Sequence, residues 1–537
     1  MTTKIGTAAN YLALLQTIDQ FLTETGHAWG LTFAGVGNGR LRGPGGTVGG
    51  YIGTADSVTE TITITASDAT TFDVVGSISG SLGTATVGTD FTSDVVEFRI
   101  VAGATPFQAG DVFTLNTGPK WTRLRFCGCP EALLRTGTYS NVASLFDGVL
   151  NTGGVSATTL PQSVTVQMGV PTPVRSLSIW NGASTAQSPN AFNLEYSDNG
   201  SSWTTAQSWT AGAWQSALQR RDFVLSSDPG AHLYWRLNIT SSNSGTTTAL
   251  TEVRLFLDAD AKVDVSSRMQ FVYTAPGVDG VQEIFYMGQT YADNGLDVYN
   301  VGLQGVEFWH DRTQDVVNVP GTSGLKWWYL AKVPIAYWIV VNGGRLMVAV
   351  RISAVYQFIY NGFGLPYETP DNHQHPLIVG GIGTTQTWRY DATGSNQLRN
   401  PCDPVNQSGT LCSMSALLPG GLWGDFGNRS PSSSNADGIG AGQATGKVWP
   451  WAQNEAGSTM TDWIRNNIDG SAPVLPAVLQ WPVDATRHTW GEFDGVYWTS
   501  GFNNSAEALL RDGAIDLLVV PNVYRTGVNH FAAIALD

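Results

Sequence analysis

The sequence predicts a mainly β, multidomain protein built from β-sandwich or jelly-roll modules, with a short N-terminal helix and a loop-rich C-terminal region. Only 13% of the 537 residues are charged, about half the usual share. Residues that favour long helices are in short supply, whereas 62 glycines provide turns. Short segments in which apolar and polar residues alternate recur between Gly and Ser positions. This alternation is typical of half-buried strands.

The length corresponds to about three to five domains, and changes of pattern along the chain suggest where they divide. The predicted divisions are 1–50 (N-terminal helix and Gly-rich linker), 51–129 (small antiparallel β module), 130–258 (second β module), 259–381 (aromatic-rich β domain) and 382–537 (loop-rich C-terminal β region).

The clearest helical pattern covers residues 10–25, with Asn10 as a candidate N-cap. Its apolar residues follow i, i+3 and i+4 spacing: Leu12, Leu15, Ile18 and Leu22. A helix this short is marginal by itself, so we expect it to dock on a partner chain. The Gly-rich segment 35–46 lacks the Gly-Lys-Ser/Thr ending of a phosphate loop, which favours a flexible or strand-bordering linker.

Residues 56–118 alternate strictly, as in Val58–Thr65 and Val95–Val101. Many short strands at even spacing indicate a sandwich or a barrel. We therefore expect a compact antiparallel module here.

Residues 130–258 carry another set of alternating strands. The most distinctive motifs are Phe146-Asp-Gly, Leu194-x-Tyr-Ser-Asp-Asn-Gly-x-x-Trp203, Tyr234-Trp-Arg-Leu-Asn-Ile239 and Leu250-Thr-Glu-Val-Arg-Leu-Phe256. Together they resemble the discoidin, or F5/8 type C, jelly roll. The resemblance implies a tight hairpin turn at Asn199-Gly200, and loops at one end of a sandwich that bind sugars or other ligands.

Four tryptophans of this module could stack on a sugar ring, because an aromatic face suits the apolar C–H side of a pyranose: Trp180, Trp203, Trp209 and Trp214. In the alternative interpretation Trp180, Trp203 and Trp235 belong to the core, while Trp209 and Trp214 border an edge or an interface. Trp209 and Trp214 are the ligand-binding candidates, with a host-surface glycan as the ligand.

The aromatic-rich domain contains two segments that read as central buried strands, 335–341 and 346–352. One strand face can build the core while the other meets a neighbouring subunit. Because Tyr and Trp are enriched at interface cores, we expect the main subunit contact here, anchored by Tyr360, Phe363 and Tyr367.

Three stretches resemble structural proteins of tailed bacteriophages or prophages: 56–118, 356–381 and 493–527. The resemblance implies a virion protein at the baseplate or tail tip, assembled in the host bacterial cytoplasm and contributing to host attachment. Its partners would be other tail or baseplate proteins, and copies of itself in a homo-oligomer of threefold or sixfold symmetry. A dedicated receptor- or glycan-binding tail protein is the alternative.

The search for catalytic chemistry gives two weak candidates. His373 and His375 share one strand face and could bind a metal, or they could form a structural loop beside Pro376. Glu492 and Asp494 could act as glycosidase carboxylates, or Asp494-Gly495 could be an ordinary turn. We therefore expect no enzyme activity, no catalytic residue and no cofactor; a glycan-degrading tail enzyme is the second alternative.

The net charge of −15 and the isoelectric point of about 4.8 disfavour partners that are themselves polyanions. Nucleic-acid binding needs clustered Lys and Arg to neutralise phosphates. No apolar run approaches the ~18 residues of a membrane-spanning helix. We expect neither nucleic-acid binding nor membrane insertion.

Overall fold

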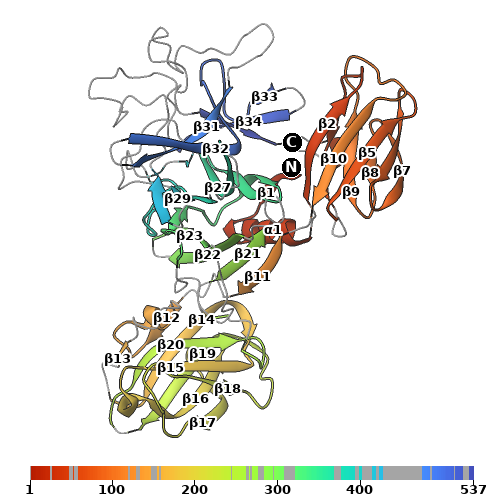
Figure 1. The fold of residues 1–537 in the computed structure, drawn as a ribbon. Coiled ribbons are helices and arrows are strands. Elements are labelled where there is room, and N and C mark those ends of the chain that lie inside the picture. Colours follow the sequence, from red (N-terminus) through yellow and green to blue (C-terminus); the bar gives the residue numbers. More distant parts are fainter. Residues whose placement is uncertain are drawn as a thin grey trace.

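The mainly β architecture is confirmed. The computed structural model describes residues 2–24, 27–46, 52–53, 58–118, 121–127, 134–146, 154–155, 159–243, 245–261, 265–266, 269–275, 284–293, 296–306, 321–367, 377–392, 398, 400–401, 414–418, 422–426, 474–483, 486–512, 515–523 and 531–536. Figure 1 shows two sandwiches attached to a larger body: β2 to β10 on one side and β12 to β20 below.

The first sandwich has a five-stranded and a four-stranded sheet. The five strands, in spatial order, are β2 (His27–Ala34), β10 (Val112–Gly118), β5 (Glu60–Ala66), β6 (Thr71–Gly76) and β7 (Gly80–Thr86). The others are β3 (Arg40–Arg42), β9 (Val96–Val101), β4 (Ile52–Gly53) and β8 (Asp90–Thr92), with the 3₁₀ turn η1 at Pro44–Gly46. The apolar residues of the alternating pattern point inward as expected: Ile62, Ile64 and Phe98 are fully buried.

Of the two interpretations of the Gly-rich segment 35–46, a flexible or a strand-bordering linker, the structure favours the second. The backbone N–H groups of Val36 and Gly37 donate to the Asp111 carboxylate at 2.9 and 3.0 Å. The same segment includes β3, which pairs with β9. The sandwich therefore begins at β2 and not at residue 51, because hydrogen bonds from distant residues order this glycine-rich stretch.

The N-terminal helix is confirmed as α1 (Tyr11–Glu24). The Asn10 side chain caps it, accepting the Ala13 N–H at 3.0 Å. Its expected docking on a partner chain is wrong, since Leu14 and Leu22 are fully buried in the core of the body. The preceding strand β1 (Thr2–Ala8) pairs with β25 (Ile335–Val341), which ties the N-terminus into the body.

The body contains two sheets, of twelve and five strands. The path of the larger sheet is β1, β25, β26 (Arg345–Ile352), β27 (Val355–Pro366), β32 (Thr486–Thr499), β35 (Phe531–Ala535), β34 (Ile515–Pro521) and β33 (Leu509–Asp512). Four further strands join it: β28 (Leu377–Gly380), β29 (Met414–Leu418), β30 (Leu422–Phe426) and β31 (Val474–Val483). The predicted divisions 259–381 and 382–537 thus share one sheet.

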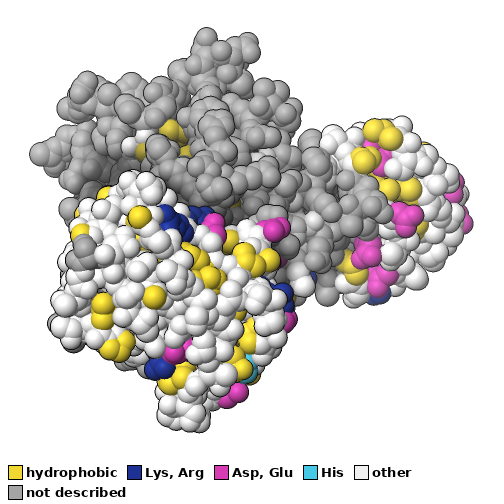
Figure 2. All heavy atoms as spheres, turned by 90° about the horizontal axis from the view of Figure 1, so that it is seen from below, with side chains coloured by type: hydrophobic (Ala, Val, Ile, Leu, Met, Phe, Trp, Pro, Cys, Tyr) yellow, Lys and Arg dark blue, Asp and Glu magenta, His cyan; other side chains and the backbone are white. Residues whose placement is uncertain are grey.

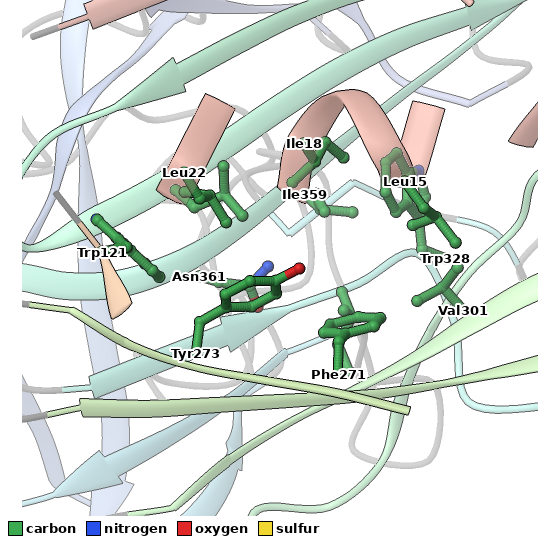
Figure 3. A pocket seen from close by; sticks show the side chains of 12 residues that line it. Leu15, Ile18, Leu22, Trp121, Phe271, Tyr273, Val301, Trp328, Ile359 and Asn361 are labelled. Atoms are coloured by element: carbon green, nitrogen blue, oxygen red, sulfur yellow. The ribbon is translucent and has the colours of Figure 1, made fainter. Parts of the chain in front are cut away.

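The smaller sheet of the body lies across α1 from the larger one. Its strands are β11 (Thr122–Cys127), β21 (Gln270–Ala275), β22 (Ile284–Asp293), β23 (Val298–Val306) and β24 (Lys326–Trp328). A cavity of about 40 Å³ remains where α1, this sheet and the strands β26 and β27 of the larger sheet meet. Figure 3 shows Leu15, Ile18 and Leu22 of α1 on one side of it and Phe271 and Tyr273 on the other.

The second sandwich covers residues 134–266, because Val265 completes its core. Its five-stranded sheet is β12 (Leu134–Gly137), β14 (Gln162–Pro173), β19 (Ala231–Ser242), β16 (Pro189–Ser197) and β17 (Thr204–Thr210). Its four-stranded sheet is β13 (Gly154–Val155), β20 (Ala249–Phe256), β15 (Ser176–Asn181) and β18 (Arg220–Val224), and the 3₁₀ turns are η2 (Val142–Phe146) and η3 (Thr185–Gln187). We call residues 134–266 the jelly-roll module.

Candidate functional site

The hairpin between β16 and β17 has the turn that its sequence predicts. Gly200 has a φ of 70°, which glycine adopts without strain. The Asn199 side chain accepts the N–H groups of Ser201 and Ser202 at 2.9 and 2.8 Å. This turn places Trp203 directly before β17.

Trp214 does not present its ring to solvent. The side chain is 4% exposed and its indole N–H donates to the Pro189 carbonyl at 2.7 Å. The Arg221 guanidinium lies 4.7 Å from the ring centroid. The prediction that Trp214 binds a ligand is therefore wrong, and Trp214 belongs to the core.

Trp209 points toward the interior of the module. It pairs across the strands with the core residue Phe192, and its ring centroid lies 5.8 Å from those of Phe192 and Phe223. The side chain stays partly exposed. Its contacts are those of a residue that closes the edge of the core, so the structure favours the alternative interpretation for Trp209.

Trp180 lies on the outer face of the four-stranded sheet and is 8% exposed. Two guanidinium groups cover it: Arg220 at 4.9 Å and Arg254 at 5.1 Å from the ring centroid. Arg254 also contacts Glu252 at 3.2 Å and Arg220 contacts Asp222 at 2.7 Å. The polar groups of this face are paired with one another.

Trp203 lies on the opposite side of the module, over the outer face of the five-stranded sheet. It is partly exposed, with the Arg236 guanidinium 4.0 Å from its ring centroid. Arg236 Nε donates to Glu195 at 2.6 Å, and the Asn238 amide donates to the same carboxylate at 3.0 Å. Arg236 and Asn238 point outward, because they alternate along β19 with the buried residues Trp235, Leu237 and Ile239.

The strand pairing places Arg236, Glu195 and Asn238 in two rows of outward-facing polar residues that cross the five-stranded sheet. We call these two rows, together with Trp203, the open face. The first row is Ser163, Asn238, Asn193 and Ser208, and the second is Thr165, Arg236, Glu195 and Thr205. The side of the module that Figure 2 shows carries few charged side chains. Sequence reasoning named Trp203 but missed the rows, which strand pairing alone creates.

A polar cluster lies at the hairpin end of the same sheet. His232 Nδ1 is 3.0 Å from Asp198, and Nε2 is 3.0 Å from the Pro229 carbonyl. The imidazole stacks on Tyr196 with ring centroids 3.9 Å apart. These contacts fix the two loops at this end of the module.

The carboxylates considered for glycosidase chemistry are engaged by the chain itself. Glu492 accepts a hydrogen bond from the Tyr367 hydroxyl at 3.0 Å. Asp494 forms an ion pair with Arg345 at 2.6 Å and accepts the Asn342 amide at 3.0 Å. This pairing gives Asp494 a structural role, but Asp494 and Gly495 lie inside β32 and do not form the ordinary turn of the alternative interpretation.

His373 and His375 lie outside the described residues. Among the residues that the structure does describe, no three His, Cys, Asp or Glu side chains group as metal ligands. No helix within that part of the chain is long and apolar enough to span a membrane.

Two of the three interface candidates are buried within the chain. Tyr360 is 0% and Phe363 is 7% exposed, and the Tyr360 hydroxyl donates to the Phe363 carbonyl at 2.6 Å. Their prediction as subunit anchors is wrong, because both rings pack inside the chain. Tyr360 lies in a core cluster with Phe493 and Trp498, and Phe363 lies in the cluster that includes α1. Tyr367 is 53% exposed and stays a candidate.

Comparison with known proteins identifies the jelly-roll module. Residues 144–223 match the family model described as the NedA-like, galactose-binding domain of the F5/8 type C group. No curated protein matches the chain.

Solved structures similar to the chain include three modules that match about a quarter of it. The family 32 carbohydrate-binding module of NanJ from Clostridium perfringens, in complex with galactose, is 17% identical and covers 25% of this chain and 98% of that one, with a TM-score of 0.21. The family 32 module of AlyQ, in complex with 4,5-unsaturated mannuronic acid, is 18% identical over 26% and 99%, with a TM-score of 0.21. An F5/8 type C domain from Bacteroides fragilis is 13% identical over 25% and 95%, with a TM-score of 0.21. The jelly-roll module is thus a discoidin-like β-sandwich, and its residues 144–223 are similar to the galactose-binding domains of that family model.

Proposed function

We propose that this protein is a structural component of a bacteriophage tail, at the baseplate or tail tip, that binds glycan through its jelly-roll module. The observation that carries the glycan-binding part is the match of residues 144–223 to a galactose-binding domain family. The open face of that module adds a surface with an aromatic ring and a row of amides and hydroxyls.

The place in a tail is supported by the resemblance of the segments 56–118, 356–381 and 493–527 to virion proteins. The low charge of the chain fits assembly through large interfaces, which are depleted in charged residues at their cores. In this proposal the protein is located in the virion and forms a symmetric homo-oligomer with other tail proteins around it. The glycan on the host surface is then the attachment target.

The binding part is tested with the full-length protein by isothermal titration calorimetry against galactose and galactose-containing oligosaccharides. We expect saturable binding that a matched series of polyols does not reproduce. Absence of binding to every neutral and acidic oligosaccharide in a glycan array would contradict it. The tail location is tested separately, by cryo-electron microscopy of virions that carry a tagged copy of the chain.

Two alternatives remain proposals with their own tests. A dedicated receptor-binding protein would adsorb to host cells when purified and would block infection. A glycan-degrading tail enzyme would release reducing sugar from host polysaccharide, and this release would be lost in Glu492→Gln.

We propose that the protein is not an enzyme, in line with the engagement of Glu492 and Asp494 by Tyr367 and Arg345.

A further inference from the structure

We propose that the open face of the jelly-roll module binds an uncharged glycan chain laid across strands β14, β19, β16 and β17. The inference rests on the proposed glycan-binding function and adds to it the position of the site and the class of sugar. It places the ligand on a sheet face, away from the loops around η3.

The first argument is hydrogen-bonding capacity that the described part of the chain does not use. The Asn193 amide and the Ser163 and Ser208 hydroxyls lie in one row, and none of them has a side-chain hydrogen bond within the described residues. Amides and hydroxyls both donate and accept, as sugar hydroxyls do. On the outer face of the other sheet, in contrast, Arg220, Asp222, Glu252 and Arg254 are paired with one another.

The second argument is charge. Arg236 and Glu195 are the charged members of the two rows, and they neutralise each other through a contact of 2.6 Å. Glu195 is 6% exposed and accepts the Asn238 amide as well. An acidic sugar would have to compete with this buried carboxylate for Arg236, and breaking such a pair is costly. The face is therefore suited to a neutral sugar.

The third argument is the aromatic ring at the edge of the rows. Trp203 is held on the face by the guanidinium of Arg236, 4.0 Å from its ring centroid. The side chain is partly exposed, and an aromatic ring can receive the apolar C–H side of a pyranose. Its place beside the polar rows matches a ligand with one apolar side and a polar rim.

The size of the face sets the length of the ligand. The strands β14, β19, β16 and β17 lie side by side, and at about 4.8 Å per strand they span about 14 Å, roughly three sugar residues in an extended chain. We therefore expect affinity to rise from one to about three residues and to change little beyond that length.

The experiment titrates full-length protein with neutral galacto-, gluco- and manno-oligosaccharides of one to four residues, and with oligogalacturonate as the acidic probe. Ser208→Arg inserts a bulky side chain into the first row, and Asn193→Ala removes an amide without removing a described contact. The matched controls are Val224→Arg, at a 44% exposed position on the other sheet, and Ser184→Arg, at the exposed start of η3. Melting temperatures verify that all four variants are folded.

We expect Ser208→Arg to weaken binding of the best neutral trisaccharide at least tenfold and Asn193→Ala severalfold, with both controls unchanged. If Ser184→Arg abolishes binding while Ser208→Arg binds normally, the ligand occupies the loops and the open-face site is overturned, although the glycan-binding function stands. Stronger binding of oligogalacturonate than of any neutral probe would overturn the sugar class. If wild-type protein binds no probe, the proposed function itself fails.

Discussion

The Arg345 guanidinium and the Asp494 carboxylate form an ion pair of 2.6 Å inside the body, joining β26 to β32. Arg345 is 1% exposed, and Gly495 next to the carboxylate has a φ of 69°. A carboxylate that sequence reasoning considered for catalysis thus holds two distant strands together.

Replacing Arg345 with Met should lower the free energy of unfolding by about 3 kcal/mol, because it leaves Asp494 without its charged partner. The control is Arg351→Met on the same strand, whose pair with Glu507 at 2.9 Å is 43% and 33% exposed. An exposed pair contributes about 1 kcal/mol or less. Chemical denaturation followed by tryptophan fluorescence measures both; equal losses would contradict the assignment.

The stability of the first sandwich should depend on Glu60 at acidic pH. Burial raises the pKa of Glu60, but hydrogen bonds from the Ser79 hydroxyl and from the Ser79 and Ile78 N–H groups outweigh it and lower the pKa below its usual value. A carboxyl whose pKa is lowered by folding stabilises the fold above its unfolded pKa of about 4.3 and loses this contribution as the pH falls through the lower folded value.

We therefore expect the melting temperature of wild-type protein to fall between about pH 5 and about pH 3 more steeply than that of Glu60→Gln. Glu60→Gln should be less stable than wild type at pH 7, where the carboxylate is charged. Calorimetric scans across this range measure the difference, and parallel curves for the two proteins would refute the role of Glu60.

Leu14→Ala should destabilise the body by about 3 kcal/mol, because this side chain of α1 is fully buried and its removal leaves a cavity. Gln16→Ala, at an exposed position of the same helix, should be neutral. Thermal unfolding compares the two. A wild-type melting temperature in Leu14→Ala would mean that α1 does not depend on this packing.

Trp214 and Trp209, the two ligand-binding candidates from the sequence, should differ in how much they stabilise the module. Trp214→Ala should cost about 3 kcal/mol or more, since it empties a buried site and leaves the Pro189 carbonyl without its donor. Trp209→Ala should cost less, because that ring is partly exposed. Neither change should alter glycan binding beyond the effect of partial unfolding, as measured by calorimetry below the melting point.

Phe363→Ser should destabilise the fold, because the ring is only 7% exposed and packs within the chain. It should therefore not yield the well-folded monomer expected from the loss of an interface anchor. Tyr367→Ser should leave the melting temperature nearly unchanged, since its side chain is 53% exposed. Multi-angle light scattering of Tyr367→Ser then tests whether this residue contributes to an oligomer. An unchanged oligomeric mass would remove the last of the three proposed anchors.

The β architecture and much of the local structure follow from patterns in the amino-acid sequence. Strict alternation predicts the inward side of strands such as β5, where Ile62 and Ile64 are fully buried. Asn10 predicts the start of α1, and Asn199-Gly200 predicts the hairpin turn. Local backbone preference and the two periods of helix and strand are sufficient for these features.

Which aromatic rings are available for binding depends on long-range packing, which local sequence patterns do not contain. A register shift between Leu194 and Glu195 sets which residues of β17 face inward, so that Trp209 contacts the core while Ser208 faces out. Tyr360 is covered by residues more than a hundred positions away, such as Phe493. A sequence pattern shows that a strand has two faces, but the long-range pairing of strands determines what covers each face.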